Sequence, residues 1–230
     1  MFTKKKACSY LVQTKELYGN VLYTAQKKSS ARLRDFSIET KNQNIKILND
    51  YEISICACQK CQLGKSRTNF VFGSGDPRAS LMLIGEAPGE YEDKKGEPFV
   101  GKSGDLLDKI LSAININREN GVFISNVLKC RPPDNRNPLV SEISKCEPYL
   151  SAQVNIIKPR LIVALGKVAG KTLTQLDVPL KAMREKTYYY NEIPVRVTYH
   201  PAALLRDPTL KTDAWEDFKW IKNFLINYDR

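Results

Sequence analysis

From residue 78 onward, short apolar runs alternate with longer segments in which apolar residues recur at helical spacing. The runs are rich in residues that favour strands, and their shortness is typical of strands buried in a sheet. Such strands are expected at residues 81–84, 122–127, 161–165 and 195–199. Helices are expected at residues 103–114, 141–157, 167–176 and 212–226, with Ser141 as an N-cap. The alternation predicts an α/β fold with three α/β/α layers and a central four-stranded parallel sheet.

The first 50 residues are polar, rich in lysine and weakly periodic. They hold 10 Lys/Arg and 4 Asp/Glu, a net charge of +6, against +5 for the remaining 180 residues. Some helical content is expected around residues 10–18 and 45–53. We therefore divide the chain into a basic N-terminal extension of unknown role (1–50) and a second domain (51–230).

The charge of the whole chain favours an anionic partner. The net charge is +11, and nucleic acid is the commonest partner of such a surface, although a basic surface that only aids solubility would look the same. The chain has no run of 18 apolar residues, so no membrane span is expected. The basic start MFTKKK is not followed by an apolar stretch, so we expect no secretory signal and a cytoplasmic location.

Unusual loops follow each of the four expected strands. They read GEAPGEYED (85–93), NVLKCRPP (126–133), GKVAG (166–170) and HPAALLRDP (200–208). Ligands of open parallel sheets bind outside the carboxyl ends of the strands. The Pro- and Gly-rich loops among these are therefore expected to converge on one cleft.

Residues 96–103, GEPFVGKS, match the phosphate-binding pattern G-x-x-x-x-G-K-[ST] of nucleotide hydrolases. That loop should leave a buried strand directly, yet residues 90–95 are charged and the nearest expected strand ends at residue 84. Pro98 has no N–H, and Phe99 is bulky. We therefore disfavour nucleotide hydrolysis and expect Lys102 and Ser103, where a helix begins, to bind a DNA phosphate.

Six cysteines in a chain without an export signal favour metal or cluster ligation over disulfides. Cys58 and Cys61 form C-x-x-C, and Cys130 and Cys146 follow with 15 residues between them. Thiolates select zinc or an iron–sulfur cluster, and a zinc ribbon usually needs a second C-x-x-C. Spacing alone leaves Cys56 as an alternative to Cys58.

Taken together, these motifs resemble the iron–sulfur-containing family 4 uracil-DNA glycosylases. The matching stretches, in order, are C-x-x-C-x-L at 58–63, GEAPGEYED at 85–93, PFVGKSGDLLD at 98–108, NVLKCRPPDNRNP at 126–138, a cysteine at 146 and HPAALLR at 200–206. The resemblance covers about residues 52–228 and leaves the N-terminal extension out. It implies a DNA-repair hydrolase that cuts the N-glycosidic bond of uracil in single- or double-stranded DNA and leaves an abasic site.

The resemblance also implies a cofactor, a [4Fe–4S] cluster on Cys58, Cys61, Cys130 and Cys146. The distance to Leu63 selects Cys58 rather than Cys56. The cluster is expected to be structural and the enzyme to be a monomer. No lysine is identified for strand cleavage, so a monofunctional enzyme is expected.

Three residues are implied to bind the flipped uracil. Phe99 would stack on the base, and Asn126 would read uracil O4 and N3–H, where cytosine presents the opposite pattern. His200, the only histidine, would donate to uracil O2 as negative charge develops. Ala87 would line the same pocket, at a position where some other uracil glycosylases carry an aspartate.

Carboxylates and DNA contacts complete the expected site. Glu86 is assigned to water positioning or electrostatic stabilisation, and Glu92 to a catalytic or thymine-excluding role. An apolar wedge fills the gap left by a flipped base in many DNA-bending proteins, and here Leu204 or Leu205 is expected to do so. Arg206 is expected to touch the DNA backbone.

Three other functions fit part of the sequence. A nucleotide hydrolase would need magnesium and a triphosphate. A non-catalytic iron–sulfur or zinc module would explain the charge and the cysteines but not the loops. A glycosylase for hypoxanthine or xanthine would share the fold, although the GEAPGE loop favours uracil.

Overall fold

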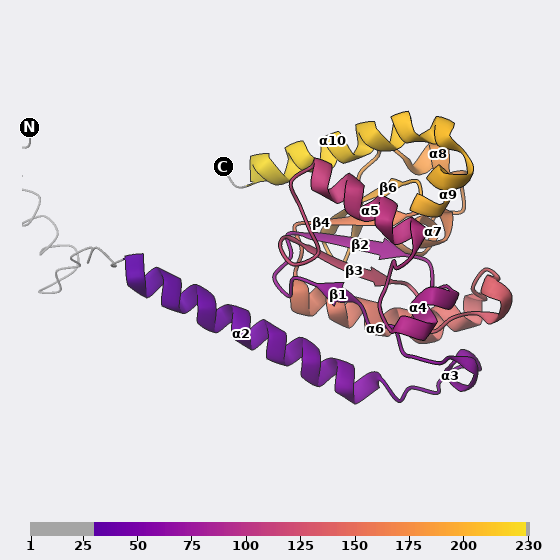
Figure 1. Cartoon of the computed structure of the whole chain (residues 1–230), viewed down its shortest axis with the longest axis horizontal. Coiled ribbons are helices and arrows are strands. Elements are labelled where there is room, and N and C mark those ends of the chain that lie inside the picture. Colours follow the sequence, from indigo (N-terminus) through magenta and orange to yellow (C-terminus); the bar gives the residue numbers. More distant parts are fainter. Residues whose placement is uncertain (1–29, 229–230) are drawn as a thin grey trace, which may run out of the picture. The chain divides into compact units, whose positions relative to one another are not determined.

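A computed structural model describes the backbone of residues 30–228 and the side chains of residues 43–228. Its sheet has six strands in the order β1-β3-β2-β4-β6-β5 (Figure 1). The strands are β1 (Ser74–Gly75), β2 (Leu81–Gly85), β3 (Val122–Asn126), β4 (Leu161–Leu165), β5 (Tyr188–Tyr190) and β6 (Ile193–Thr198).

The expected α/β class is confirmed, but the sheet is larger than expected and mixed. The four expected strands are β2, β3, β4 and β6, which pair in parallel, while β1 and β5 add antiparallel edges. Pattern analysis missed β1 because it has only two residues. It missed β5 because three tyrosines form no apolar run. The turn from β5 into β6 is made by Asn191 and Glu192, at φ 47° and 65°.

Helices occupy most of the remaining described chain. They are α2 (Ser30–Ile55), α3 (Leu63–Ser66), α4 (Glu90–Lys95), α5 (Lys102–Ala113), α6 (Val140–Ile157), α7 (Lys167–Thr174), α8 (Leu180–Met183), α9 (Pro201–Arg206) and α10 (Lys211–Tyr228). The four expected helices are α5, α6, α7 and α10. Ser141 is not the N-cap as expected: α6 begins one residue earlier, and the Glu142 carboxylate accepts the Leu139 N–H at 2.8 Å.

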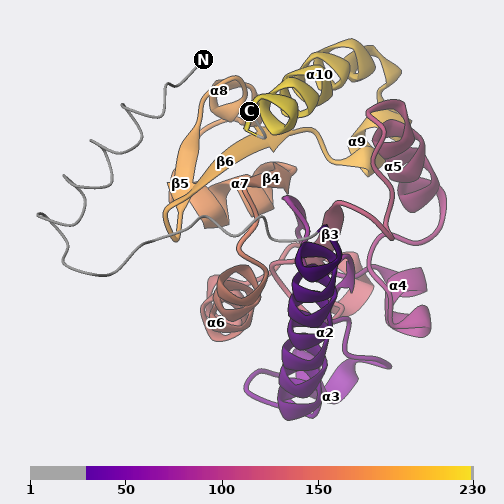
Figure 2. The same cartoon turned by 90° about the vertical axis from the view of Figure 1, so that its left-hand side faces the viewer.

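Two separate cores lie on the two faces of the sheet, which makes the three layers. Leu81 and Leu83 of β2 belong to the core with α5 and α10, whereas Met82 and Ile84 belong to the core with α6 and α7. Figure 2 shows α6 on the opposite side of the sheet from α5 and α10. Because both faces are covered, every residue of β2, β3 and β4 is buried, as parallel strands require.

The chain divides into two compact units, Met1–Glu39 and Thr40–Arg230. The division expected at residue 50 falls inside α2, and Leu48 of that helix is buried in the core with α6. The helix expected around residues 45–53 lies within α2, whereas the one expected around residues 10–18 lies outside the described residues, as does Cys8. Between residues 30 and 228, no helix combines the length and the apolar character that crossing a membrane requires.

Candidate active site and cysteine cluster

The loops after β2, β3, β4 and β6 line one cleft of about 1110 Å³ at the carboxyl ends of these strands. The expected convergence of the loops is therefore confirmed. The cleft is larger than a single base needs, so a base with its flanking backbone would fit. Predicted site residues that line it are Glu86, Ala87, Glu92, Phe99, Lys102, Ser103, Asn126, His200 and Arg206.

Gly85 and Asn126 are partners in the register of β2 and β3, at the floor of the cleft. Asn126 is only 3% exposed. A Cβ at Gly85 would lie 2.4 Å from Asn126 Oδ1 and 2.6 Å from Phe99 Cζ. These distances are too short for any side chain, so a glycine here lets the Asn126 amide and the Phe99 ring both approach the backbone.

Phe99 is buried, and its backbone is in the left-handed region at φ 53°. A bulky residue rarely adopts this conformation, so other contacts must hold it. Arg118 does so, since its guanidinium donates to the carbonyl oxygens of Pro98 at 2.9 Å and Phe99 at 2.6 Å.

His200 precedes α9 and caps it. Its Nδ1 accepts the Ala202 N–H at 3.1 Å, which leaves Nε2 to carry the proton of the neutral ring. Burial, with a smaller effect of Arg206, lowers the pKa of His200 to about 4. His200 is therefore neutral at pH 7, with one N–H free to donate.

Glu86 and Glu92 have different surroundings. Burial raises the pKa of Glu86, and within residues 43–228 its carboxylate has no hydrogen-bond partner. Both oxygens of Glu92 are occupied, by the Gly89 N–H at 3.1 Å and the Val100 N–H at 3.0 Å. Glu92 therefore caps the start of α4 and ties the loop that holds Phe99 to that helix, and of these two carboxylates Glu86 is the one free to act on a ligand.

The two leucines expected as wedges differ in exposure. Leu204 is 1% exposed, and its assignment as a DNA contact is wrong because the side chain is committed to the interior. Leu205 is 43% exposed on the same helix and remains the candidate. The six-residue sequence of α9, PAALLR, is too short to show which of its positions are buried and which are exposed.

The phosphate-loop match does not form a phosphate-binding loop of the nucleotide-hydrolase kind. The helix α4 separates β2 from the GEPFVGKS segment, and Gly96 ends that helix. Lys102 and Ser103 lie in the first turn of α5 and line the cleft.

Four cysteines from three segments come close together at the core with α6. Cys130 and Cys146 are buried in the core with α6, and Cys58 and Cys61 pack against that core. Burial raises the pKa of Cys146 to about 11, with smaller contributions from Cys130 and Cys61. Such mutual effects require the sulfur atoms to be neighbours.

Two of these four sulfur atoms accept a hydrogen bond from a side chain. Arg67 donates to Cys130 Sγ at 3.1 Å, and Tyr149 donates to Cys58 Sγ at 3.2 Å. Cys56 is exposed, and its thiol donates to the Ile53 carbonyl at 3.3 Å instead. The structure therefore groups Cys58, rather than Cys56, with the other three cysteines.

In the described part of the chain, no three His, Cys, Asp or Glu side chains are arranged to hold a metal ion. An iron–sulfur cluster differs from a single metal ion, because its thiolate ligands do not have to converge on one ion. Four soft ligands with N–H and O–H donors to their sulfurs fit that chemistry.

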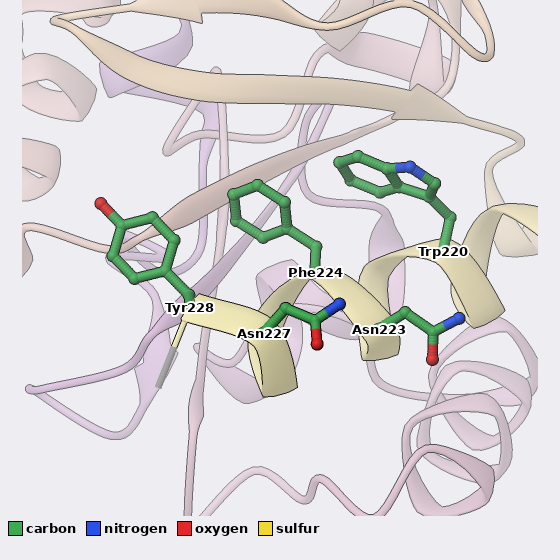
Figure 3. A pocket seen from close by; sticks show the side chains of 5 residues that line it. All are labelled: Trp220, Asn223, Phe224, Asn227 and Tyr228. Carbon is green, nitrogen blue, oxygen red and sulfur yellow. The ribbon is translucent and has the colours of Figure 1, made fainter. Parts of the chain in front are cut away.

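A second hollow lies along α10 and is lined by Trp220, Asn223, Phe224, Asn227 and Tyr228 (Figure 3). The Trp220 and Phe224 rings stack with centroids 5.1 Å apart. The hollow shares no residue with the cleft and offers no carboxylate or imidazole, so it is not a candidate for hydrolytic chemistry.

Sequence patterns missed two residues that shape the cleft. Gly85 could have been found, since a glycine that ends a buried strand signals a close approach. Arg118 lies in a polar connection between α5 and β3, and no local pattern marks it, because its partners are backbone carbonyls about twenty residues away.

Comparisons with known proteins agree with this geometry. A profile of the Uracil DNA glycosylase superfamily matches residues 72–219. A "Type-4 uracil-DNA glycosylase" of Sulfurisphaera tokodaii is 44% identical over 76% of this chain and 84% of that protein. Proteins of the same name from Archaeoglobus fulgidus and Thermotoga maritima are 42% identical over 76% and 91%, and 41% identical over 73% and 89%, of the two chains. The chain therefore belongs to the uracil-DNA glycosylase superfamily and, within it, to the type-4 family.

Proposed function

We propose that this protein hydrolyses the N-glycosidic bond of uracil in DNA, which releases free uracil and leaves an abasic site. The observation that supports this most directly is the neutral His200, whose Nε2–H is free in a cleft that also holds Asn126 and Phe99. Catalysis by these residues needs neither a nucleotide nor a magnesium ion.

Recognition of uracil is assigned to Asn126 and Phe99. The Asn126 amide can accept from N3–H and donate to O4, whereas cytosine has an acceptor and a donor in the reverse places. Phe99 offers a ring face for stacking at the same end of the cleft. Ala87 leaves room beside the base, because its methyl group is the smallest side chain that a non-glycine residue has.

Bond cleavage moves the electron pair of the C1′–N1 bond onto the base. We assign His200 to stabilise the resulting charge at O2 through its Nε2–H, a donor of a kind typically worth about 10²–10³ in rate. Water then adds to C1′, and the proton that it loses passes through solvent to the uracil anion, which leaves as neutral uracil. We assign Glu86 to orient that water or to stabilise the positive sugar, and Glu92 to position the Phe99 loop.

Contacts with DNA are assigned to the rim of the cleft. Lys102 and Ser103, in the first turn of α5, would bind a phosphate, and Arg206 would bind another. The exposed Leu205 would fill the space that the flipped nucleotide leaves. We propose that the protein acts as a monomer on single- or double-stranded DNA.

We propose that Cys58, Cys61, Cys130 and Cys146 hold a [4Fe–4S] cluster. When bound, the cluster would cross-link three chain segments, and we assign it no step in base excision. The proposal rests on four neighbouring soft ligands with hydrogen-bond donors at their sulfurs.

The test is excision from a labelled oligonucleotide that carries one uracil, by the wild type and by His200→Ala and Asn126→Ala. We expect an abasic product from the wild type and at least about a tenfold lower rate in both variants. No excision by brown, cluster-loaded protein would overturn the proposal. Hypoxanthine- and xanthine-containing strands in the same assay test the related-glycosylase alternative.

A further inference from the structure

Lys129 is a buried cation that the proposed chemistry leaves unused. Its side chain is 0% exposed, and it lies between the uracil-reading end of β3 and the helix α6. Within residues 43–228 it forms no ion pair with a carboxylate. Burial disfavours the charged form of this group, and the nearby Cys130 and Cys146 thiolates are the groups that favour it.

Three neutral acceptors take the three hydrogens of the ammonium group. Lys129 Nζ donates to Ser125 Oγ at 2.6 Å, to the Asn126 carbonyl at 2.8 Å and to Gln153 Oε1 at 2.6 Å. Two of these acceptor residues are themselves held by the Phe72 carbonyl, because Ser125 Oγ and Gln153 Nε2 both donate a hydrogen bond to it. The network is complete, so each member has a defined position.

The bond to Asn126 fixes the peptide that follows this residue. The carbonyl oxygen of that peptide accepts from Lys129, while its N–H, that of Val127, donates to the Gly85 carbonyl at 2.9 Å. Both ends of one peptide plane are thus held, which sets the direction in which the Asn126 side chain leaves the backbone. The amide has little freedom to correct an error, because its Oδ1 already lies against Gly85.

We infer that Lys129 is a positioning residue that fixes the Asn126 backbone in the orientation in which the amide reads uracil. The inference rests on the proposed function, because it concerns how the uracil pocket is held. It assigns Lys129 a role in addition to that of a cation near the Cys130 and Cys146 thiols. Without the ammonium group, the Asn126 carbonyl and Gln153 Oε1 would lose their donor and the strand end could shift.

A double-mutant cycle tests the inference in the full-length, cluster-loaded protein. The variants are Lys129→Met, Asn126→Ala and both together, and the readout is the single-turnover rate on a uracil oligonucleotide. We expect Lys129→Met to lower the rate by about tenfold in the wild-type background but by less than about twofold in the Asn126→Ala background. An equal loss in both backgrounds would overturn the inference, since Lys129 would then act independently of Asn126.

Two controls separate positioning from general damage. Ile157→Ala removes a buried side chain at the far end of α6, and should lower the melting temperature without a rate loss that depends on Asn126. Lys219→Met removes an exposed positive charge on α10 and should change neither. Iron content and visible absorbance should match the wild type in Lys129→Met, and loss of the cluster with recovery of the rate on reconstitution would overturn the positioning role.

If Lys129→Met does not fold, Ser125→Ala tests the positioning role of Lys129 instead. It keeps the ammonium group and removes one of its acceptors, so we expect a rate loss of about threefold that disappears in the Asn126→Ala background. An unchanged rate in Ser125→Ala would overturn the inference. Failure of the wild type to excise uracil is a different result, because it would remove the proposed function itself.

Discussion

The rings of Phe99 and His200 stack, with centroids 5.2 Å apart and planes inclined by 30°. The contact joins the residue proposed to stack on the base to the residue proposed to stabilise its charge. Phe99 also covers the imidazole, so it contributes to the burial that lowers the pKa of His200 to about 4.

Removal of this cover should raise the pKa of His200. In Phe99→Ala the imidazole gains water, and we expect its pKa to move from about 4 towards 6.5. Because His200 is the only histidine, its ring resonances in a proton NMR titration need no assignment. A pKa that stays near the wild-type value in Phe99→Ala would show that other groups desolvate the ring.

The free energy of unfolding should depend on pH through the same residue. The unfolded chain binds a proton on His200 near pH 6.5, whereas the folded protein does so only near pH 4. Stability is therefore full above pH 6.5 and falls as the pH drops towards 4, by about 3 kcal/mol. Urea unfolding of the wild type and His200→Gln at several pH values measures this, and equal slopes between pH 4 and 6.5 would contradict it. Glu86 titrates in both proteins and cancels in the comparison.

Gly85→Ala should disable the pocket without unfolding the protein. The new methyl group would meet Asn126 Oδ1 and the Phe99 ring, so both must move, and we expect a rate loss of about 10²-fold. Gly121→Ala is the matched control, since Gly121, at φ 88°, precedes β3 at its opposite end. That variant should lose stability but keep its rate. Similar rates for the two variants would refute the crowding argument.

Leu204 and Leu205 form a matched pair on α9. Leu205→Ala should lower excision from double-stranded DNA by about tenfold and from single strands much less, because only a duplex leaves a gap to fill. Leu204→Ala should instead cost about 2–5 kcal/mol of stability through a buried cavity. Excision from both substrates and urea unfolding of both variants check this, and an equal effect of Leu205→Ala on both strand forms would argue against a wedge.

Cys58 and Cys56 form a second pair. Cys58→Ser should reduce the iron content and the brown colour of the purified protein, because a serine oxygen is a poor substitute for a soft thiolate. Cys56→Ser should keep both, since that thiol faces the Ile53 carbonyl. Iron and sulfide analysis of the two variants distinguishes them, and the reverse result would reassign the ligand.

Much of the fold was predictable because buried parallel strands leave a strong local signal. Four apolar runs marked β2, β3, β4 and β6, and the loops after them marked the cleft. The edge strands β1 and β5 were not predictable, since their pairing depends on neighbours rather than on their own few residues. Which of Leu204 and Leu205 is buried depends on which side of the six-residue helix α9 packs against the interior.

The sequence by itself determined the α/β class, the order of the motifs and the residue types at the strand ends, since these follow from periodicity and from chemistry along the chain. Only the tertiary structure decided how those residues act. It placed the Glu92 carboxylate between the Gly89 and Val100 N–H groups, and it brought the Lys129 ammonium group to the Asn126 carbonyl. It left the Glu86 carboxylate without a hydrogen bond from any residue between 43 and 228. Such roles arise from contacts between segments distant in sequence, and burial sets their charge states.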